Sequence, residues 1–184
     1  MEISQTNIKE LLIIKPSLNE DNRGYLFESF NENKYSEIVV DKNFVLEFFS
    51  KSKKNTIRGL HYQIGKYAQD KLITVIQGKI LDVAVDIRFG SPNFGKYISV
   101  ELSDQNHFQF WIPKGFAHAF IALDDNSILQ YKCTNYHSKE NERGIIYNDP
   151  DIGINWSIEN PILSDKDLKN PLLRNIKKDF FFEK

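Results

Sequence analysis

Residues 72–88 of this 184-residue chain, LITVIQGKILDVAVDIR, decide its fold class. Two β-rich runs flank Gln77-Gly78-Lys79, and this pattern predicts a tight antiparallel hairpin. Because side chains alternate along a strand, the second run has an apolar face and a charged face. The apolar face holds Leu81, Val83, Val85 and Ile87, and the other holds Asp82, Ala84, Asp86 and Arg88. We expect the first face to be core and the second to border solvent or a wet cavity.

Similar short runs, each ended by Gly, Asn, Asp or Pro, recur on both sides of this hairpin. Helical patterns are few: Asn31 is expected to cap a short helix that reaches Val39, and Ser164 a second that reaches Lys169. Many short strands without long helices predict an all-β sandwich or barrel, and the lack of a linker or repeat predicts one domain over residues 1–184. The expected strands are residues 11–14, 25–30, 44–50, 57–63, 72–76, 80–87, 97–102, 109–112, 117–123 and 128–136.

The composition excludes several classes of protein. Lys plus Arg number 24 and Asp plus Glu 25, so the formal net charge of −1 lacks the basic footprint of a nucleic-acid binder or a peripheral membrane protein. No stretch approaches roughly 18 consecutive apolar residues and no signal-peptide pattern opens the chain, so we expect a cytoplasmic protein. The single cysteine, Cys133, excludes an internal disulfide and a multi-cysteine zinc site. The 14 Phe, 8 Tyr and 2 Trp suit the walls of a cavity between sheets.

Four side chains could carry acid–base chemistry, although each also has a structural explanation. His61 lies mid-strand in RGLHYQ and titrates closest to neutral pH, but a lone strand histidine is more often a core residue. His118 follows the Pro/Gly turn of WIPKGFAHAF and is weak evidence by itself. Tyr131 lies on the apolar face of its strand, where a hydroxyl donates a proton in catalysis or simply bonds a neighbour. Asp167 follows Ser164 in a helix-start pattern, so spacing alone favours a capping role.

The pattern of histidines argues against a metal site. His61, His107, His118 and His137 are scattered, without an H-x-H or H-x-x-x-H pair that would supply two ligands from one strand or helix face. The chain also has no G-x-G-x-x-G, G-x-x-x-x-G-K or G-x-S-x-G sequence. Nicotinamide, P-loop and serine-hydrolase chemistry therefore lack their signatures.

Seven segments, taken in order, resemble the dTDP-4-dehydrorhamnose 3,5-epimerase family. They are DNRGYLFE at 21–28, RGLHYQ at 58–63, KLITVIQGKILDVAVDIR at 71–88, WIPKGFAHAF at 111–120, YKCTNYH at 131–137, YNDPDIGINW at 147–156 and LSDKD at 163–167. The resemblance implies a cupin-type β-roll that needs neither metal nor cofactor and is usually a homodimer. It further implies that the N-terminal segment packs on the partner subunit and helps to complete its site.

The same resemblance implies a nucleoside-diphosphate 4-keto-6-deoxysugar as substrate and inversion of the carbons that flank the ketone. A C–H next to a ketone is a weak acid, so such an enzyme needs a base and a group that stabilises the enolate. The resemblance makes His61 the base, Asp167 the carboxylate that orients it, Lys71 the cation near the enolate oxygen, and Tyr131 the acid on the opposite face. It places Arg23, Glu28, Arg58, Gln63, His118 and His137 among the substrate-binding residues.

Alternation along residues 57–63 puts Arg58 and His61 on opposite faces of their strand. If both reach one substrate, the strand must bulge or bend near Gly59. We therefore predict an irregular strand at this glycine. A straight strand would remove Arg58 from the site.

Two departures from the family pattern leave the substrate open. Before RGLHYQ the family commonly carries F-V-Q-D-N-H-S, whose amides contact the nucleotide, but here Leu46 and Phe48 replace the Gln and Asn. A different nucleotide, such as GDP, or a sugar such as a heptose is therefore an alternative to a dTDP-hexose. His137 stands where the family usually has a second tyrosine, which makes inversion at C3 alone an alternative to inversion at both C3 and C5. A cupin-type 3,4-ketoisomerase and a non-catalytic β-roll that binds sugar nucleotides are the remaining alternatives.

Overall fold

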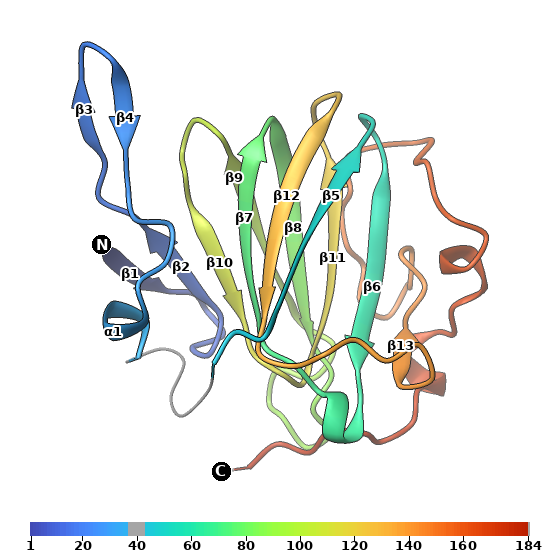
Figure 1. Cartoon of the computed structure of the whole chain (residues 1–184). Coiled ribbons are helices and arrows are strands. Elements are labelled where there is room, and N and C mark those ends of the chain that lie inside the picture. The colour runs from blue at the N-terminus through green and yellow to red at the C-terminus, as the bar shows by residue number, and fades with distance from the viewer. Residues whose placement is uncertain (37–42, 184) are drawn as a thin grey trace.

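The computed structural model describes residues 1–36 and 43–183, which fold into two packed antiparallel sheets with a few short helices (Figure 1). One sheet has six strands in the order β1 (Glu2–Gln5), β2 (Leu12–Lys15), β10 (Gln109–Ile112), β7 (Lys71–Gln77), β12 (Ser127–Cys133) and β5 (Leu46–Ser52). The other has five, in the order β13 (Glu142–Gly144), β6 (Ile57–Gln63), β11 (Phe116–Ala122), β8 (Lys79–Asp86) and β9 (Tyr97–Ser103). The expected all-β fold is confirmed.

Smaller elements surround these sheets. A separate hairpin, β3 (Asn19–Asp21) and β4 (Gly24–Leu26), projects from the body beside the six-stranded sheet (Figure 1). The helices are α1 (Glu32–Tyr35), η1 (Gly65–Tyr67), η2 (Asp167–Lys169) and η3 (Leu173–Asn175). Within the described part of the chain, no helix is both long and apolar enough to cross a membrane. The cytoplasmic location stays a prediction.

The predicted hairpin over residues 72–88 is wrong in one respect. Both strands form, but β7 pairs with β10 and β12, whereas β8 pairs with β11 and β9 in the other sheet. The turn at Gly78 therefore carries the chain from one sheet to the other. Gly78 has φ 78°, and a Cβ there would lie 2.8 Å from Ser127 Oγ, so this crossing requires glycine. Residues near in sequence favour a hairpin, but the partners that bury each strand's faces lie far along the chain.

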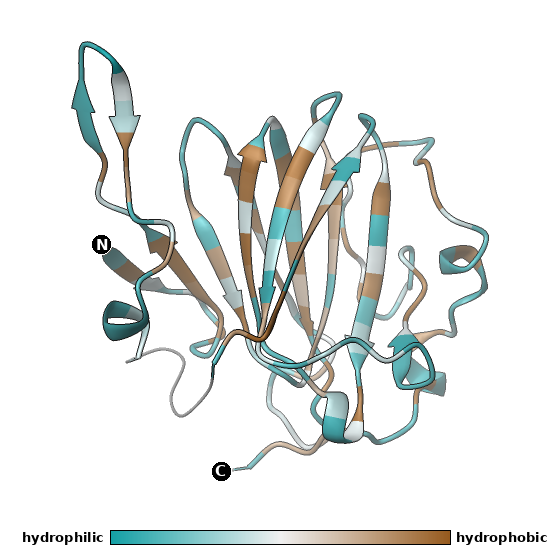
Figure 2. Cartoon of the chain, in the orientation of Figure 1, coloured by the Kyte–Doolittle hydropathy of each residue, from teal (hydrophilic) through white to brown (hydrophobic). Residues whose placement is uncertain are grey.

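Both faces of β8 are buried. Val83 and Val85 of the predicted core face pack under the C-terminal segment, together with Ile145 and Trp156. The opposite face lies between the two sheets, where Asp82 is fully buried. This outcome confirms the core face and selects the interior cavity over solvent for the charged face. Figure 2 shows the underlying alternation as brown and teal segments along β6 and β12.

The helix start expected at Asn31 is confirmed, whereas the second helix begins later than predicted, at Asp167, and ends at Lys169 as expected. The Asn31 side chain accepts a hydrogen bond from the Lys34 backbone N–H and caps α1, while the predicted end at Val39 lies outside the described residues. Ser164 Oγ accepts from the Asp167 backbone N–H at 3.1 Å, yet only one 3₁₀ turn follows. This cap fixes the backbone of Asp167 at the edge of the cavity described below.

Candidate active site

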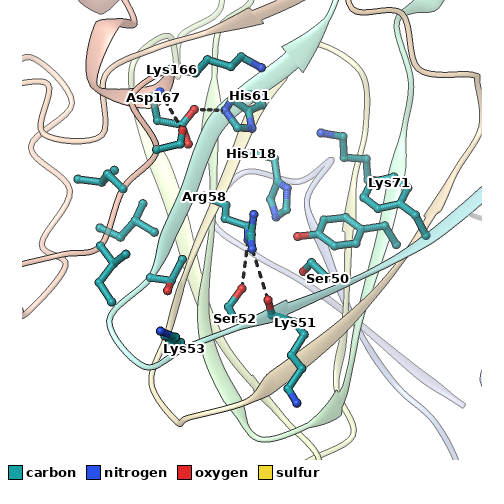
Figure 3. A pocket seen from close by; sticks show the side chains of 17 residues that line it. Ser50, Lys51, Ser52, Lys53, Arg58, His61, Lys71, His118, Lys166 and Asp167 are labelled. Atoms are coloured by element: carbon teal, nitrogen blue, oxygen red, sulfur yellow. Dashed lines mark hydrogen bonds and ion pairs between the residues drawn. The ribbon is translucent and has the colours of Figure 1, made fainter.

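A cavity of about 830 Å³ opens between the two sheets (Figure 3). Its walls come from β5, β6, β7, β11 and β12, and the segment 162–167 closes one side. Sequence analysis had singled out His61, Lys71, Arg58, His118, Tyr131 and Asp167, and all six line this cavity. Residues separated by more than 100 positions thus meet at one place.

His61 and Asp167 form a hydrogen-bonded pair. The Nε2 atom of His61 lies 2.5 Å from Oδ1 of Asp167, and their side chains are 27% and 5% exposed. Burial raises the pKa of Asp167, but the hydrogen bonds from His61, Ser164 and the Gly59 backbone outweigh it and lower the pKa below its usual value. Asp167 is therefore a carboxylate at neutral pH and accepts a hydrogen bond from the Nε2–H group of His61.

The predicted irregularity of β6 at Gly59 is confirmed. His61 pairs with His118 of β11, but Arg58 pairs with Phe120. Three residues along β6 therefore span the same distance as two residues along β11, which is a β-bulge. Gly59 has φ 125°, and a Cβ there would lie 2.4 Å from the Ala119 Cβ. Only glycine fits this close approach. The bulge brings Arg58 and His61 to the same cavity, as Figure 3 shows.

His118 is held by a buried carboxylate. Its Nε2 atom lies 2.8 Å from Oδ1 and 3.0 Å from Oδ2 of Asp82, and the two side chains are 5% and 0% exposed. Burial lowers the pKa of His118 and raises that of Asp82, because either charged form loses its hydration. On the charged face of β8, Asp82 therefore holds a histidine that lines the cavity, whereas Asp86 binds Arg88.

Tyr131 and Lys71 approach the cavity from the six-stranded sheet. Burial raises the pKa of the Tyr131 hydroxyl far above its usual 10, so this group keeps its proton at physiological pH. Burial also lowers the pKa of Lys71, although the charges of Cys133, Asp82 and Glu142 act in the opposite direction. Within residues 1–36 and 43–183, the Nζ atom of Lys71 has no hydrogen-bond or ion-pair partner. It is available to a ligand in the cavity, into which Figure 3 shows it pointing.

The cavity has a basic rim that sequence analysis did not identify. Lys51, Lys53 and Lys166 join Arg58 among its lining residues (Figure 3). Arg58 is fixed by hydrogen bonds from Nε to Ser52 Oγ at 3.1 Å and from Nη2 to the Lys51 carbonyl at 3.3 Å. The sequence signal for Lys166 was its position next to Asp167. Together these cations can hold a polyanion such as a diphosphate.

Four predicted binding residues lie outside the cavity of their own chain. Arg23 pairs with Asp21 on the projecting hairpin, and the exposed Glu28 pairs with Lys34 of α1. His137 is half exposed and lies 3.5 Å from Glu142, which also binds Lys166 at 2.6 Å. Gln63 is buried and accepts a hydrogen bond from the Ser138 backbone N–H at 3.1 Å. Their expected roles in substrate binding stay predictions.

A search of the described residues finds no group of three or more His, Cys, Asp or Glu side chains arranged to hold a metal ion. The two histidines of the cavity each bind a carboxylate instead. These donors are organised as hydrogen-bonded pairs that orient an imidazole. Such pairs move protons.

Comparisons with known proteins identify the family. Residues 5–175 match the family described as dTDP-4-dehydrorhamnose 3,5-epimerase. The chain belongs to this family. A dTDP-4-dehydrorhamnose 3,5-epimerase from Shigella flexneri is 48% identical over 169 residues, which cover 91% of this chain and 93% of the relative.

Solved structures agree with the family assignment. The crystal structure of dTDP-6-deoxy-D-glucose-3,5-epimerase from Legionella pneumophila, in complex with dTDP-4-keto-L-rhamnose, is similar with a TM-score of 0.95 and 43% identity, covering 100% of this chain and 99% of that one. A 3'-monoepimerase from Streptomyces bikiniensis, in complex with dTDP-quinovose, is similar with a TM-score of 0.87 and 29% identity, covering 92% and 87%.

Membership of the dTDP-4-dehydrorhamnose 3,5-epimerase family confirms the predicted fold and the predicted enzyme class. The cupin-type β-roll is the fold of the family's solved structures, and the enzyme class, an isomerase that epimerises 4-keto sugars linked to a nucleotide, follows from the match over most of the chain. The catalytic roles expected for His61, Asp167, Lys71 and Tyr131 stay predictions.

Proposed function

We propose that this chain inverts C3 and C5 of a dTDP-linked 4-keto-6-deoxysugar through enolate intermediates. The observation that carries the proposal is the arrangement of acid and base: His61 belongs to the five-stranded sheet and Tyr131 to the six-stranded sheet, and both line one cavity. A sugar ring between the sheets therefore has a base on one face and an acid on the other. Removal of a proton from one face and its return to the other inverts the carbon.

His61 acts as the base in this proposal. Asp167 accepts a hydrogen bond from the Nε2–H group of His61, so the Nδ1 atom is left to take the proton from carbon. The Asp167 carboxylate then stabilises the imidazolium that forms. Lys71 places a cation in the cavity where charge develops on the C4 oxygen. Tyr131 then returns a proton to the opposite face, a role that suits a hydroxyl whose raised pKa keeps it protonated.

The nucleotide diphosphate occupies the basic rim in this proposal. Lys51, Lys53, Arg58 and Lys166 all line the cavity and bring positive charge to it. The Legionella relative in complex with dTDP-4-keto-L-rhamnose supports dTDP over GDP, despite Leu46 and Phe48 in place of the family's amides. The His61–Asp167 hydrogen bond of 2.5 Å weighs against a non-catalytic β-roll.

Inversion at C3 alone is the second candidate function. His137 replaces the family's usual second tyrosine, and it is paired with Glu142 outside the cavity. The similarity to a 3'-monoepimerase, at 29% identity, keeps this outcome in the test. A 3,4-ketoisomerase has no comparable support.

One experiment tests the reaction. The protein is incubated with dTDP-4-keto-6-deoxyglucose in deuterated water, and NMR follows deuterium at C3 and C5; a GDP-linked analogue runs in parallel. We expect exchange and inversion at both carbons with the dTDP sugar. Exchange at C3 alone selects the second candidate, a strong preference for the GDP analogue contradicts the nucleotide, and no exchange with either contradicts the epimerase.

Variants assign the roles. His61→Ala is expected to lower exchange by about 10²–10⁴-fold, because a general base typically contributes that much. Tyr131→Phe is expected to keep exchange and lose inversion, because it removes the returning acid and leaves the base. Tyr97→Phe is a matched control for Tyr131→Phe, since Tyr97 lies in β9 and does not line the cavity. Undiminished exchange in His61→Ala would remove His61 from this role.

We propose also that the chain forms a homodimer in which the N-terminal hairpin completes the partner's cavity. Arg23 is exposed and does not line the cavity of its own chain, and Tyr25 and Leu26 beside it are 54% and 74% exposed. A projecting hairpin with exposed apolar side chains on β4 gains by packing on a second copy. Arg23 and Glu28 would then reach the substrate across the interface.

Complementation between two inactive variants tests this arrangement. Arg23→Ala and His61→Ala subunits are unfolded together, refolded together and assayed. We expect the mixture to reach about a quarter of the wild-type activity, because half of the dimers are mixed and each mixed dimer has one intact pocket. A monomer in analytical ultracentrifugation, or a mixture no more active than Arg23→Ala alone, would contradict the shared site.

A further inference from the structure

Phe48 lies flat against Tyr131. The two residues are direct cross-strand partners in the β5–β12 register, so their side chains share the face that borders the cavity. Their ring centroids are 4.5 Å apart and the ring planes differ by 14°, a stacked arrangement. The next residue, Phe49, points to the other face of the sheet, does not line the cavity and is 58% exposed.

The other neighbours of the Tyr131 ring are buried. His118 meets the ring edge-on, with centroids 6.0 Å apart and planes at 74°, and is 4% exposed. Ile73, the partner of Tyr131 in β7, is fully buried in the same core cluster. Phe48, in contrast, is 41% exposed while Tyr131 is 7% exposed. Phe48 is thus the one of these three neighbours that stands between the Tyr131 ring and solvent.

From this geometry we propose that Phe48 is a positioning residue for Tyr131. The stack holds the phenol in one orientation and shields it from water at the cavity mouth. The inference rests on the proposed epimerase function, in which Tyr131 returns a proton to one face of the sugar. An enolate that finds Tyr131 displaced is instead reprotonated by the imidazolium of His61 on its original face. When the imidazolium N–H has first exchanged with the deuterated solvent, the carbon receives deuterium but has not been inverted.

The proposal predicts a change in one ratio, that of inverted product to deuterium found in recovered substrate. In Phe48→Ala we expect this ratio to fall about tenfold, because a misplaced group loses rate steeply. Phe48→Tyr, which restores a ring for stacking, should recover the ratio to within about twofold of wild type. The matched control is Phe49→Ala, which removes the same ring from the opposite face of the same strand and should leave the ratio unchanged. Phe48→Leu serves in place of Phe48→Ala if circular dichroism shows that the alanine variant does not fold.

Each outcome decides the matter. A lowered ratio that Phe48→Tyr restores supports positioning. An unchanged ratio with a raised KM would mean that Phe48 is merely a wall of the substrate pocket, and an unchanged ratio with unchanged KM would give it no part in the reaction; both overturn the inference. The wild-type protein separates this test from that of the proposed function, because a wild type that neither exchanges nor inverts defeats the epimerase itself.

Discussion

Strand β8 separates two interiors that are built on different principles. On one side Val83, Val85 and Ile87 pack under the C-terminal segment in a core made of apolar side chains. On the other side Asp82 and His118 form a buried ionisable pair beside the cavity, among apolar neighbours that include Ile80 and Ala84. The burial of apolar area stabilises both interiors, whereas the ionisable pair in the second costs free energy because charged groups lose hydration. The face of β8 toward the C-terminal segment therefore serves stability, and the opposite face serves both stability and the cavity.

Truncation in the core under the C-terminal segment is expected to change stability more than any other substitution proposed below. Ile87→Ala should lower the free energy of unfolding by about 2–5 kcal/mol, because Ile87 is 1% exposed and its removal leaves a cavity. Urea denaturation measures this loss. The ratio of inversion to exchange in the folded fraction should stay at the wild-type value.

A control and a contrary outcome sharpen this test. Ile76→Ala, at a residue that is 50% exposed, should change the free energy of unfolding by no more than about 0.5 kcal/mol. If Ile87→Ala altered the ratio of inversion to exchange, the two interiors would be coupled through β8. The division of labour proposed for that strand would then be wrong.

A substitution in the cavity is expected to act in the opposite direction. Lys71→Met should abolish inversion but raise the free energy of unfolding by about 1 kcal/mol, because it removes a partly buried cation that has no ion-pair partner among the described residues. Lys79→Met, at a lysine that is partly exposed and 3.6 Å from Glu101, is the control and should not stabilise. A destabilised Lys71→Met would show that the lysine supports the fold.

The pH dependence of the stability gained by Lys71→Met over the wild type gives a finer test. Burial lowers the pKa of Lys71 below its usual 10.5, so between the folded and unfolded pKa values the native state binds fewer protons than the unfolded state. Wild-type stability from this group therefore rises with pH across that window. The advantage of Lys71→Met should be full below the folded pKa and should shrink as the pH approaches 10.5. An advantage that grew with pH would contradict the shift.

The strands that sequence analysis found are those with strong alternation or a buried apolar run. It missed β1, β3 and β13, because Glu2–Gln5 and Asn19–Asp21 are exposed throughout and Glu142–Gly144 has only three residues. These segments become strands only through their partners. The bulge at Gly59 was predictable because two functional side chains had the wrong spacing for a straight strand.

The candidate site was predicted more completely than its surroundings. The motifs supplied His61, Lys71, Tyr131 and Asp167, and the fold brings all four to one cavity. The role of Asp82 as the partner of His118 could not be predicted, because no sequence pattern relates residues on adjacent strands that are 36 positions apart. Lys166 was overlooked for a different reason, because its sequence neighbours Ser164 and Asp167 indicate only a helix cap.

The amino-acid sequence by itself determined most of the strands, which side chains share a face and which motifs resemble the family, because these follow from local alternation and from residue types. The tertiary structure alone decided that residues 72–88 cross between two sheets instead of forming a hairpin. It also decided that Phe48 covers Tyr131 and that Asp82 faces His118. Those outcomes depend on the free energy of burying both faces of each strand, and the partners that do so are distant in the chain.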